Sequence, residues 1–468
     1  MASAEQPTTR PLWGSRVQAP LTSTAIELSS STDVDRPLAI YDVAATRAHL
    51  HELERLGLLD AAGRSRLDEA LADVAAQLAD GTFAWSDDHE DVHMNVEAAV
   101  RAAVGPELAG QLQAGRSRNE EVVTDERLWL LDAVPELDAG IRELQVTLVR
   151  RAEEHVDAVV PAHTHTQPAQ PTLLAHHLLA FVEMLERDRG RLADARSRAD
   201  ASPAGSGAAV GSGLPIDRVG VARRIGFGSI SANSIDAVAD RDYAVELIGA
   251  CALALVHLSR LAADLVLWST PYYRFARIGD GQASGSSMLP NKRNPDVAEL
   301  VRARAARAQG DLLAALSVQA GLPLGYHRDL QETRAPMQSS VASLRLCLAA
   351  MTETLAGVTF DREAMAAAAR SGHALATALA ERLVRAGVPF RDAHWRVGEL
   401  VATADAAACD LADLPRGSLA EALPELASLD PIVPDLAEAV AAADLPGGTA
   451  PSRVRAALAD ARERIQRP

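Results

Sequence analysis

Residues 285–295 read Gly-Ser-Ser-Met-Leu-Pro-Asn-Lys-Arg-Asn-Pro, and they contain Lys292, the only lysine in a chain of 468 residues. Every other member of the 46 lysines and arginines is an arginine. An ammonium group is a compact point charge, whereas a guanidinium group is a planar fork, so the two cations are not interchangeable. A single lysine among serines, asparagines and prolines indicates a position where the fork does not fit. We therefore expect the chemistry of the protein in this loop.

The loop leads into a predicted helix. Pro295 would be the first helical residue, with Asn294 as its N-cap and Asp296 in the first turn. Free backbone N–H groups and the helix dipole favour an anion at such a start. Together with Lys292, this arrangement predicts a carboxylate or enolate site beside a flexible glycine-rich segment at 279–287. An ordinary capped helix after a loop is the alternative interpretation.

The composition predicts a helical protein without nucleic-acid or membrane partners. The chain is 48% hydrophobic but only 3% aromatic, and alanine and leucine dominate. A net charge of −17 disfavours nucleic acid, whose phosphates need a basic face. Charged residues interrupt the apolar stretch 244–268, which predicts a buried bundle helix instead of a membrane span. The three dispersed cysteines (Cys251, Cys347 and Cys409) suit a reducing compartment, and we expect a soluble, cytoplasmic protein.

Apolar spacing of three and four residues predicts short helices from residue 35 to about 103. Residues 1 to about 33 lack this periodicity and are expected to form an extended arm. No strand signal is strong anywhere, and the chain beyond about residue 360 predicts a smaller helical appendage. Longer helices are predicted at 120–157, 172–200, 235–268 and 295–320.

Two further polar segments have the residue types of a reaction site. His163–Pro171 places two histidines between prolines, where one could act as acid or base near neutral pH. A turn histidine satisfied by the backbone explains the same residues. In Gly115–Glu121, Arg118 and Asn119 could clamp a carboxylate, although an exposed basic turn is the simpler interpretation.

Other polar stretches predict structural roles. Ser202–Gly213 superficially resembles a phosphate loop, but it lacks a lysine and a preceding strand, so we expect a linker. Tyr326–Arg334 predicts a charged, solvated face. Glu90, Asp91 and His93 do not have the spacing of metal ligands, and no metal site is expected.

Residues 285–295 resemble the signature of the fumarase/aspartase superfamily, glycine-serine-serine-x-methionine-proline-x-lysine-x-asparagine-proline, with Leu289 in place of methionine. Within that superfamily the chain is similar to the argininosuccinate lyase and delta-crystallin family over almost its whole length. The match is loose over the last 100 residues or so. The other segments that carry the resemblance are Leu12–Gly14, Glu90–Met94, Gly115–Asn119, Thr164–Pro171, Asn233–Val238 and Tyr326–Gln331.

The resemblance implies an all-α fold of three helical domains around a long central bundle. The expected domains are an N-terminal arm and small helical domain at 1–111, the central bundle at 112–357 and a small C-terminal domain at 358–468. It also implies a homotetramer with a 20-helix core, in which several subunits share each active site.

The implied reaction is a β-elimination that splits argininosuccinate into fumarate, which retains the dicarboxylate of the succinyl group, and arginine, without a metal or organic cofactor. Ser286 would be the base that removes a Cβ proton of the succinyl group. Lys292 and the helix start would stabilise the resulting aci-carboxylate, because preorganised charge is the largest available source of stabilisation. His165 would protonate or steady the leaving nitrogen, with Glu299 as its carboxylate partner.

The resemblance also implies a set of substrate contacts. On the succinyl carboxylates these are Ser117, Arg118, Asn119 and Thr164. On the arginine portion they are Ser31, Asp35, Tyr326 and Gln331. Gln167, Asn291, Asn294 and Arg334 complete the expected set.

Several positions depart from the family pattern and leave the identity of the amine open. Glu120-Glu121 stand where Asp-Gln is usual, Asn291 replaces a glutamine, and Arg334 replaces a lysine. Thr166, Pro168 and Ala239 depart as well. One alternative is a paralogous lyase that releases fumarate from a different N-(1,2-dicarboxyethyl) amino acid. A non-catalytic, crystallin-like structural protein is another, but Ser286, His165, Lys292 and Glu299 are all retained.

Overall fold

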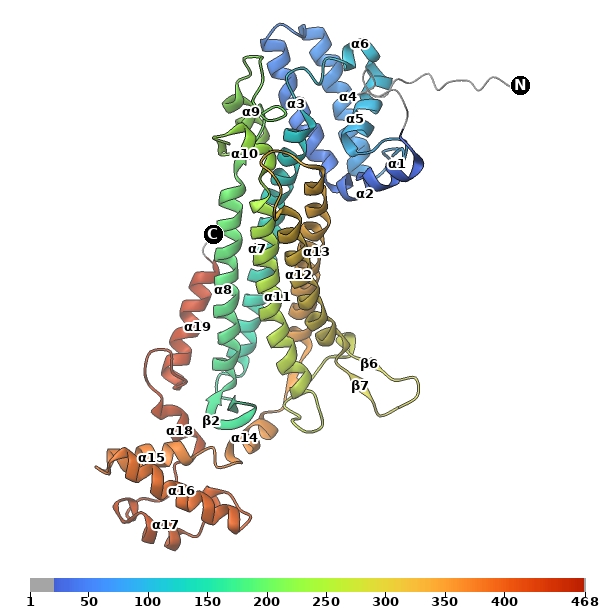
Figure 1. The fold of residues 1–468 in the computed structure, drawn as a ribbon. Coiled ribbons are helices and arrows are strands. Elements are labelled where there is room, and N and C mark those ends of the chain that lie inside the picture. Colours follow the sequence, from blue (N-terminus) through green and yellow to red (C-terminus); the bar gives the residue numbers. More distant parts are fainter. Residues whose placement is uncertain (1–20, 467–468) are drawn as a thin grey trace. The chain divides into compact units, whose positions relative to one another are not determined.

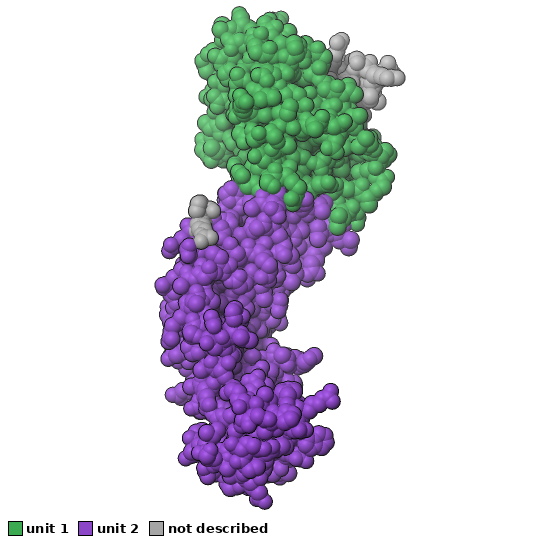
Figure 2. Space-filling view, turned by 90° about the vertical axis from the view of Figure 1, so that its left-hand side faces the viewer, with its two compact units in different colours: residues 1–132, 196–244, 315–335 green, residues 133–195, 245–314, 336–468 purple. Residues whose placement is uncertain are grey.

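The computed structural model describes residues 21–466, which belong to two compact units (Figures 1 and 2). The described residues are mostly helical, as predicted, with four small two-stranded sheets. Leu12–Gly14 and most of the expected N-terminal arm lie outside the described residues. Unit 1 comprises residues 1–132, 196–244 and 315–335, and unit 2 comprises residues 133–195, 245–314 and 336–468.

Short helices form the N-terminal part of unit 1, which confirms the prediction from residue 35 to about 103. The expectation of an extended arm up to about residue 33 is wrong at Ser23–Ser29, which are helical, with the Thr22 hydroxyl accepting the N–H of Ala25 as a cap. Leu50, Leu53, Leu67 and Leu71 pack into one core, because helical spacing puts them on facing stripes. The helices are α1 (Ser23–Ser29), α2 (Thr32–Asp35), α3 (Ala39–Arg55), α4 (Ala61–Asp80), α5 (Val92–Val104) and α6 (Pro106–Ala109), with the 3-10 turn η1 (Arg36–Leu38) before α3.

The predicted continuous helix over 235–268 is wrong at one point. Helix α10 (Ser234–Ala239) ends before Asp240, whose backbone is extended, and α11 (Asp242–Trp268) starts anew. The Asp240 carboxylate accepts the N–H of Asp242 at 2.7 Å, so this residue caps a new helix instead of continuing the old one. Unit 1 also contains α9 (Arg218–Ile225), the parallel strands β3 (Ala201–Ser202) and β4 (Ser229–Ile230), and the 3-10 helix η3 (Arg328–Thr333).

Long helices pack side by side within unit 2 (Figure 1). Gln145 Nε2 donates to the carbonyl of Val182 at 3.2 Å, which joins α7 (Arg118–Glu154) to α8 (Leu174–Ala199). His257 Nδ1 lies 2.7 Å from Asp188 Oδ2 and joins α11 to α8. Three of these long helices were predicted to within a few residues: α7, α8 and α12 (Asp296–Gln319). The pattern did not predict α13 (Arg334–Gly357).

Helix α11 is long and apolar enough to cross a membrane by length and composition alone. Half of its most apolar 18-residue window, 50%, is buried inside the described chain. Both His257 and Asp264 on this helix pair with residues of α8, at 2.7 and 2.8 Å. These polar contacts and the partial burial suit a bundle helix.

The chain also forms a β-hairpin that the sequence did not predict. Strand β1 (Val159–Thr164) pairs antiparallel with β2 (Gln167–Leu173), with a bulge between Ala162 and His163. Prolines within both strands conceal the usual strand signal, because proline cannot donate to a sheet ladder. A two-stranded sheet tolerates them because each strand is an edge.

The remaining helices complete unit 2. Leu379, Leu383, Val397 and Leu411 belong to a separate hydrophobic core. The helices are α14 (Arg362–Arg370), α15 (Ala376–Arg385), α16 (Phe390–Ala406), α17 (Arg416–Ala422), α18 (Leu436–Ala442) and α19 (Pro451–Gln466). Strand β5 (Ala276–Arg277) pairs with β8 (Thr359–Phe360), and β6 (Ser284–Gly285) pairs with β7 (Arg293–Asn294). The three-domain division with boundaries after residues 111 and 357 stays a prediction.

Candidate active site

The predicted chemical loop connects β6 and β7 and extends away from the helices of unit 2 (Figure 1). Asn294 belongs to β7, pairs with Ser284 and donates its side-chain N–H to Ser284 Oγ at 3.3 Å. The prediction that Asn294 caps the next helix is therefore wrong. Helix α12 begins at Asp296, and the carbonyl of Pro295 accepts the first helical hydrogen bond from Glu299 at 3.1 Å. Pro295 itself occupies the N-cap position.

Ser286 is half-buried, and two backbone groups donate hydrogen bonds to its hydroxyl oxygen. The N–H groups of Met288 and Leu289 lie 3.3 and 3.0 Å from Ser286 Oγ. Two donors aimed at one oxygen stabilise a negative charge on it more than a neutral hydroxyl. The Lys292 side chain is exposed in the same loop, and its ammonium has no hydrogen-bond or ion-pair partner among residues 21–466.

His165 occupies the tip of the β1–β2 hairpin. The paired residues Thr164 and Gln167 leave a two-residue turn, in which His165 and Thr166 have φ values of 55° and 59°. Two positive φ values define a turn usually formed by Asn-Gly, and neither histidine nor threonine is favoured there. Strained backbone of this kind is often found at functional sites. The side chains of Thr164, His165, Thr166 and Gln167 are all exposed, and His165 has no side-chain partner in the described chain.

Three predicted carboxylate contacts lie at the start of α7 in unit 1. Ser117 precedes the helix and accepts the N–H of Asn119 at 3.3 Å, so the first-turn N–H groups and the helix dipole face this point. Arg118 is already paired with Glu90 Oε1 at 3.0 Å and Asp91 Oδ2 at 3.3 Å. The side-chain N–H of Asn119 donates to a backbone carbonyl, that of Ala208. A substrate carboxylate would therefore have to share Arg118 with two acidic residues.

The predicted amine contacts form a buried network in unit 1. Ser31 Oγ donates to Asp35 Oδ2 at 2.5 Å, and Arg334 Nη1 donates to Asp35 Oδ1 at 2.5 Å. Tyr326 and Gln331 are half-buried. The prediction of a solvated face at 326–334 is wrong for its C-terminal end, because Arg334 is only 2% exposed.

The same network contains residues that the sequence analysis missed. Glu126 Oε1 accepts from Arg334 Nε at 2.6 Å, and the hydroxyl of Tyr243 donates to the same carboxylate. Arg241 is fully buried, and its Nε lies 3.3 Å from Glu126 Oε2. Burial would raise the pKa of Glu126, but Arg241 and Arg334 lower it below its ordinary value. The sequence signal that could have indicated Glu126 was the run of charged residues at 125–127, inside the helix predicted at 120–157.

A second buried cluster in unit 1 surrounds His93. Its Nδ1 lies 3.0 Å from Asp42 Oδ1, and its Nε2 lies 3.9 Å from Asp125 Oδ2. Arg116 Nε lies 3.1 Å from Glu121 Oε1 beside them. Burial would lower the pKa of His93, but Asp42 and neighbouring carboxylates raise it to about 10. Burial raises the pKa of Asp125 well above its ordinary range.

Asp42, His93 and Asp125 also form a group whose possible metal-ligand atoms lie within 4.8 Å of one another. A metal ion needs the neutral imidazole, whereas the raised pKa favours the protonated ring at neutral pH. The arrangement therefore suits an ion-pair network between an imidazolium and two aspartates.

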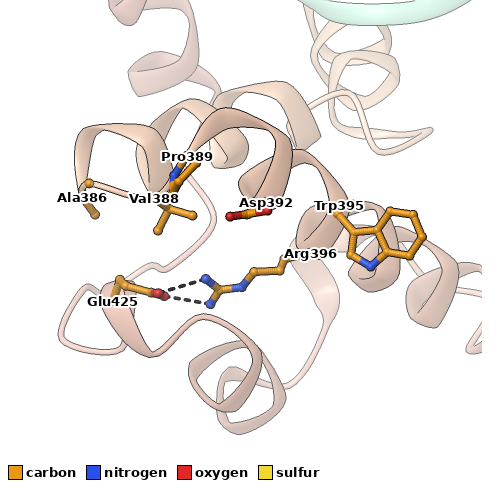
Figure 3. Close-up of a pocket in the computed structure, with 8 residues that line it drawn as sticks. Ala386, Val388, Pro389, Asp392, Trp395, Arg396 and Glu425 are labelled. Atoms are coloured by element: carbon orange, nitrogen blue, oxygen red, sulfur yellow. Dashed lines mark hydrogen bonds and ion pairs between the residues drawn. The ribbon is translucent and has the colours of Figure 1, made fainter.

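A cavity of ≈ 600 Å³ in the C-terminal helices contains none of the predicted site residues (Figure 3). Arg396 on α16 extends toward Glu425, and its two Nη atoms lie 2.9 and 2.8 Å from the two carboxylate oxygens. Both ends of the fork are thus occupied. Trp395 points away from this pair and is 70% exposed.

The predicted site residues are distributed between the two units. Unit 1 holds Ser31, Asp35, Ser117, Arg118, Asn119, Tyr326, Gln331 and Arg334, and unit 2 holds Thr164, His165, Gln167, Ser286, Asn291, Lys292, Asn294 and Glu299. Within unit 1 the structure joins Ser31, Asp35 and Arg334 into one network, and within unit 2 it joins Ser286, Asn291 and Lys292 in one loop. Glu299 is exposed in the first turn of α12, and its nearest cation is Arg302 at 3.8 Å.

The helical fold and the serine–lysine loop define a lyase of the fumarase/aspartase class. A lyase family model matches residues 26–310, and a model of the argininosuccinate lyase C-terminal region matches residues 373–443. The solved structure of EDDS lyase in complex with formate superposes with a TM-score of 0.83 and 27% identity, covering 94% of this chain and 88% of that one.

Two curated relatives narrow the class to one family. Argininosuccinate lyase of Thiobacillus denitrificans is 43% identical over 460 residues, which cover 97% of this chain and 98% of the relative. Argininosuccinate lyase of Symbiobacterium thermophilum is also 43% identical, over 97% of this chain and 99% of the relative. The chain belongs to the argininosuccinate lyase family of carbon–nitrogen lyases.

Proposed function

We propose that the protein cleaves argininosuccinate to fumarate and arginine, as a cytoplasmic enzyme of arginine biosynthesis. The substrate assignment is supported by 43% identity to argininosuccinate lyases over 97% of the chain. The chemical observation that carries the proposal is the pair of backbone N–H groups on Ser286 Oγ. Neither a metal nor an organic cofactor takes part in the proposed reaction.

Ser286 acts as the base. A free serine hydroxyl is far too weak a base for a succinyl Cβ proton, so its alkoxide must be stabilised. The N–H groups of Met288 and Leu289 supply two dipoles, and the Lys292 ammonium adds a full charge when the loop closes on substrate. Loss of the Cβ proton places a second negative charge on the adjacent carboxylate, which becomes a dianionic aci-carboxylate. Lys292, Asn294 and the start of α12 stabilise this charge.

Collapse of the aci-carboxylate breaks the C–N bond and releases fumarate. His165 donates a proton to the leaving nitrogen, and Glu299 orients the imidazole. Thr164, Gln167 and Asn291 position the succinyl carboxylates together with Ser117, Arg118 and Asn119 at the start of α7. Ser31, Asp35, Tyr326, Gln331 and Arg334 hold the amino-acid end.

We propose that the active enzyme is a homotetramer with a 20-helix core and with sites shared between subunits. Exposed Lys292 and His165 lack side-chain partners in the described chain, and an elimination site needs such groups held and shielded from water. The long helices also expose large apolar side chains, including Leu300 at 63%, Leu313 at 67% and Leu346 at 54%. Apolar surface of this kind marks interfaces.

A second candidate is a lyase that releases fumarate from a different N-(1,2-dicarboxyethyl) amino acid. One observation favours it. The Arg334 guanidinium donates hydrogen bonds to both Asp35 and Glu126, so the charge of Asp35 is partly neutralised. A neutralised Asp35 would hold a cationic amino acid less tightly than a free carboxylate.

Fumarate release, followed by ultraviolet absorbance, tests both candidates. Argininosuccinate, aspartate, malate and adenylosuccinate are offered separately to the purified protein. Turnover of argininosuccinate alone is expected. Failure on all four by a correctly assembled enzyme would reject the first candidate and favour the second.

A further inference from the structure

A second cavity, lined by apolar as well as charged residues, lies behind the chemical loop within unit 2. Its volume is ≈ 830 Å³, large enough for a metabolite of several carboxylate or phosphate groups. Asn294 and Pro295 line one side, but Ser286 and Lys292 do not line it. The cavity therefore adjoins the loop at its base and not at its reactive tip.

Arginines dominate the charged lining of this cavity. Four of them, Arg274, Arg277, Arg293 and Arg362, face two carboxylates, Asp361 and Glu363. In a chain with a net charge of −17, this local excess of cations is a departure from the average surface. Guanidinium groups bind carboxylate and phosphate oxygens through forked hydrogen bonds.

Not every one of these charges is available to a ligand. The Arg362 fork is taken up by His155 at 3.1 Å, Asp157 at 3.1 Å and the carbonyl of Glu154 at 2.5 Å. Asp361 caps α14, because its carboxylate accepts the N–H of Ala364 at 2.9 Å. The cations left for a ligand are Arg274 and Arg277, which precede the loop, and Arg293, which follows it.

Arg274 is the most available of them. Its guanidinium has no hydrogen-bond or ion-pair partner within residues 21–466. Its backbone has a φ of 54°, an unfavourable conformation for a residue with a side chain. The rings of Tyr273 and Phe275, the two chain neighbours of Arg274, pack edge to face with their centroids 5.3 Å apart. Backbone strain at a free cation in a cavity is typical of a binding position.

Arg277 and Arg293 share one acidic partner, Asp280, and Arg293 Nη2 also donates to the carbonyl of Ile278 at 2.5 Å. Arg293 Nη1 lies 2.6 Å from Asp280 Oδ1, and Arg277 Nη2 lies 4.0 Å from the same oxygen. Asp280 is 86% exposed, so water screens this pairing. A multivalent anion in the cavity would compete with Asp280 for both arginines. Arg293 lies between Lys292 and Asn294 in sequence. A change in its contacts would therefore alter the conformation of the chemical loop.

We propose that this cavity is a regulatory site for a small multivalent oxyanion, a polycarboxylate or a phosphate compound, held by Arg274, Arg277 and Arg293. Occupation of the site changes the conformational freedom of residues 286–292. The site is distinct from the catalytic dicarboxylate site, because its free arginines lie outside the expected catalytic set.

Isothermal titration calorimetry on the full-length protein tests the site. Citrate and pyrophosphate are titrated separately at constant ionic strength, with saturating fumarate present to occupy the catalytic site. Binding of one anion per chain is expected. Binding of citrate would identify a polycarboxylate ligand, and binding of pyrophosphate would identify a phosphate compound. The double variant Arg274→Ala/Arg277→Ala should bind at least about tenfold more weakly, because it loses two charge-assisted contacts. Arg391→Ala, at an exposed arginine of α16, should bind like the wild type.

The proposal is overturned if neither anion binds at concentrations up to about 10 mM, or if the double variant binds as tightly as the wild type. Hydrogen exchange of residues 286–292 tests the coupling: it should change on binding in the wild type and not in the double variant. Unchanged exchange in an anion-bound wild type would contradict the coupling. The double variant should still release fumarate at the wild-type rate without added anion, because neither arginine belongs to the proposed catalytic set. Anion binding is measured by calorimetry and fumarate release by absorbance, so a failure of this proposal is distinguished from a failure of the proposed function.

Discussion

At the scale of single residues, the proposed chemistry rests on a few polar groups of two short segments. Ser286 receives two backbone hydrogen bonds, while Lys292 and His165 have no side-chain partner in the described chain. The buried charges around Arg334 and His93 are the opposite case, because each contacts several opposite charges. Lys292 and His165 are therefore available for a ligand, whereas the charges around Arg334 and His93 are already paired within the fold.

Replacing Ser286 with alanine should reduce fumarate release by at least about a hundredfold, the lower range of a general-base contribution. The fold should survive, because the side chain is only half-buried and makes no contact beyond its own turn. Steady-state kinetics and circular dichroism measure the two effects. Ser287→Ala is the matched control, since Ser287 is exposed one residue away. Activity above a hundredth of wild type in Ser286→Ala would reject the role of base.

Lys292→Arg should be nearly as damaging, because a planar fork cannot replace a point charge in this turn. The expected loss of kcat/KM is on the order of a hundredfold, equivalent to about 2.7 kcal/mol of transition-state stabilisation. The converse change at an exposed helical position, Arg150→Lys, should have no effect. A near-normal Lys292→Arg enzyme would mean that the single lysine is incidental.

The His93 cluster predicts a stability that falls at alkaline pH. The pKa of His93 is raised to about 10 in the fold, against about 6.5 in an unfolded chain. Its contribution is therefore complete below about pH 6.5 and is lost as pH rises through about 10. The groups that face it are Asp42, Asp125 and Glu121, with Arg116 beside them.

Urea unfolding between about pH 7 and pH 10 measures this dependence, and the wild type should lose more than about 1.4 kcal/mol, the equivalent of one pKa unit. His93→Gln should show a flatter profile, whereas His394→Gln, at an exposed histidine, should follow the wild type. An NMR titration of His93 in the wild type checks the same point if the variant does not fold. A His93 midpoint near 6.5 would contradict the ion-pair network.

At the scale of elements, the β1–β2 hairpin and the β6–β7 loop carry the proposed catalytic residues His165, Ser286 and Lys292 on a helical scaffold. Both connect long helices, and both end in turns whose backbone geometry is set locally. The hairpin tip has two successive positive φ values at His165 and Thr166. Because a β-branched residue is disfavoured there, the tip is a strained element.

Thr166→Asn should therefore stabilise the protein by about 1 kcal/mol, since asparagine tolerates the left-handed conformation. Thermal unfolding measures the gain. Ala162→Gly in β1 is the contrasting variant, because Ala162 is paired with Gln170 and glycine in a strand should destabilise by about 0.5–1 kcal/mol. An unchanged or lower melting temperature in Thr166→Asn would show that the turn is not strained.

At the scale of the whole molecule, the proposed tetramer would cover the apolar side chains that the long helices expose. Leu346→Glu on α13 should weaken assembly and fumarate release together, because it places a charge in an apolar interface. Leu445→Glu is the matched control, since Leu445 is 75% exposed but lies outside the long helices. Light scattering and activity assays measure both properties. A fully active monomer of the wild type would contradict shared sites.

The local sequence was informative where the physical cause was local. Apolar periodicity predicted α7, α8 and α12, because helical packing repeats every three or four residues. The single lysine indicated the chemical loop, and the signature around it led to the lyase family that the relatives confirm. The β1–β2 hairpin was missed because prolines hide its alternation, and the break at Asp240 was missed because a capping aspartate looks like any surface charge.

By itself, the sequence determined the class of protein and the positions of most helices, and it predicts the reactive loop, since each depends on neighbouring residues. Only the tertiary structure decided that Arg334 is buried between Asp35 and Glu126, and that His93 lies between Asp42 and Asp125. The partners in each of these contacts are far apart in the chain: 32 positions for His93 and Asp125, 51 for His93 and Asp42, 208 for Arg334 and Glu126, and 299 for Arg334 and Asp35. Burial changes their electrostatics, and burial is a property of the packed fold and not of the local sequence.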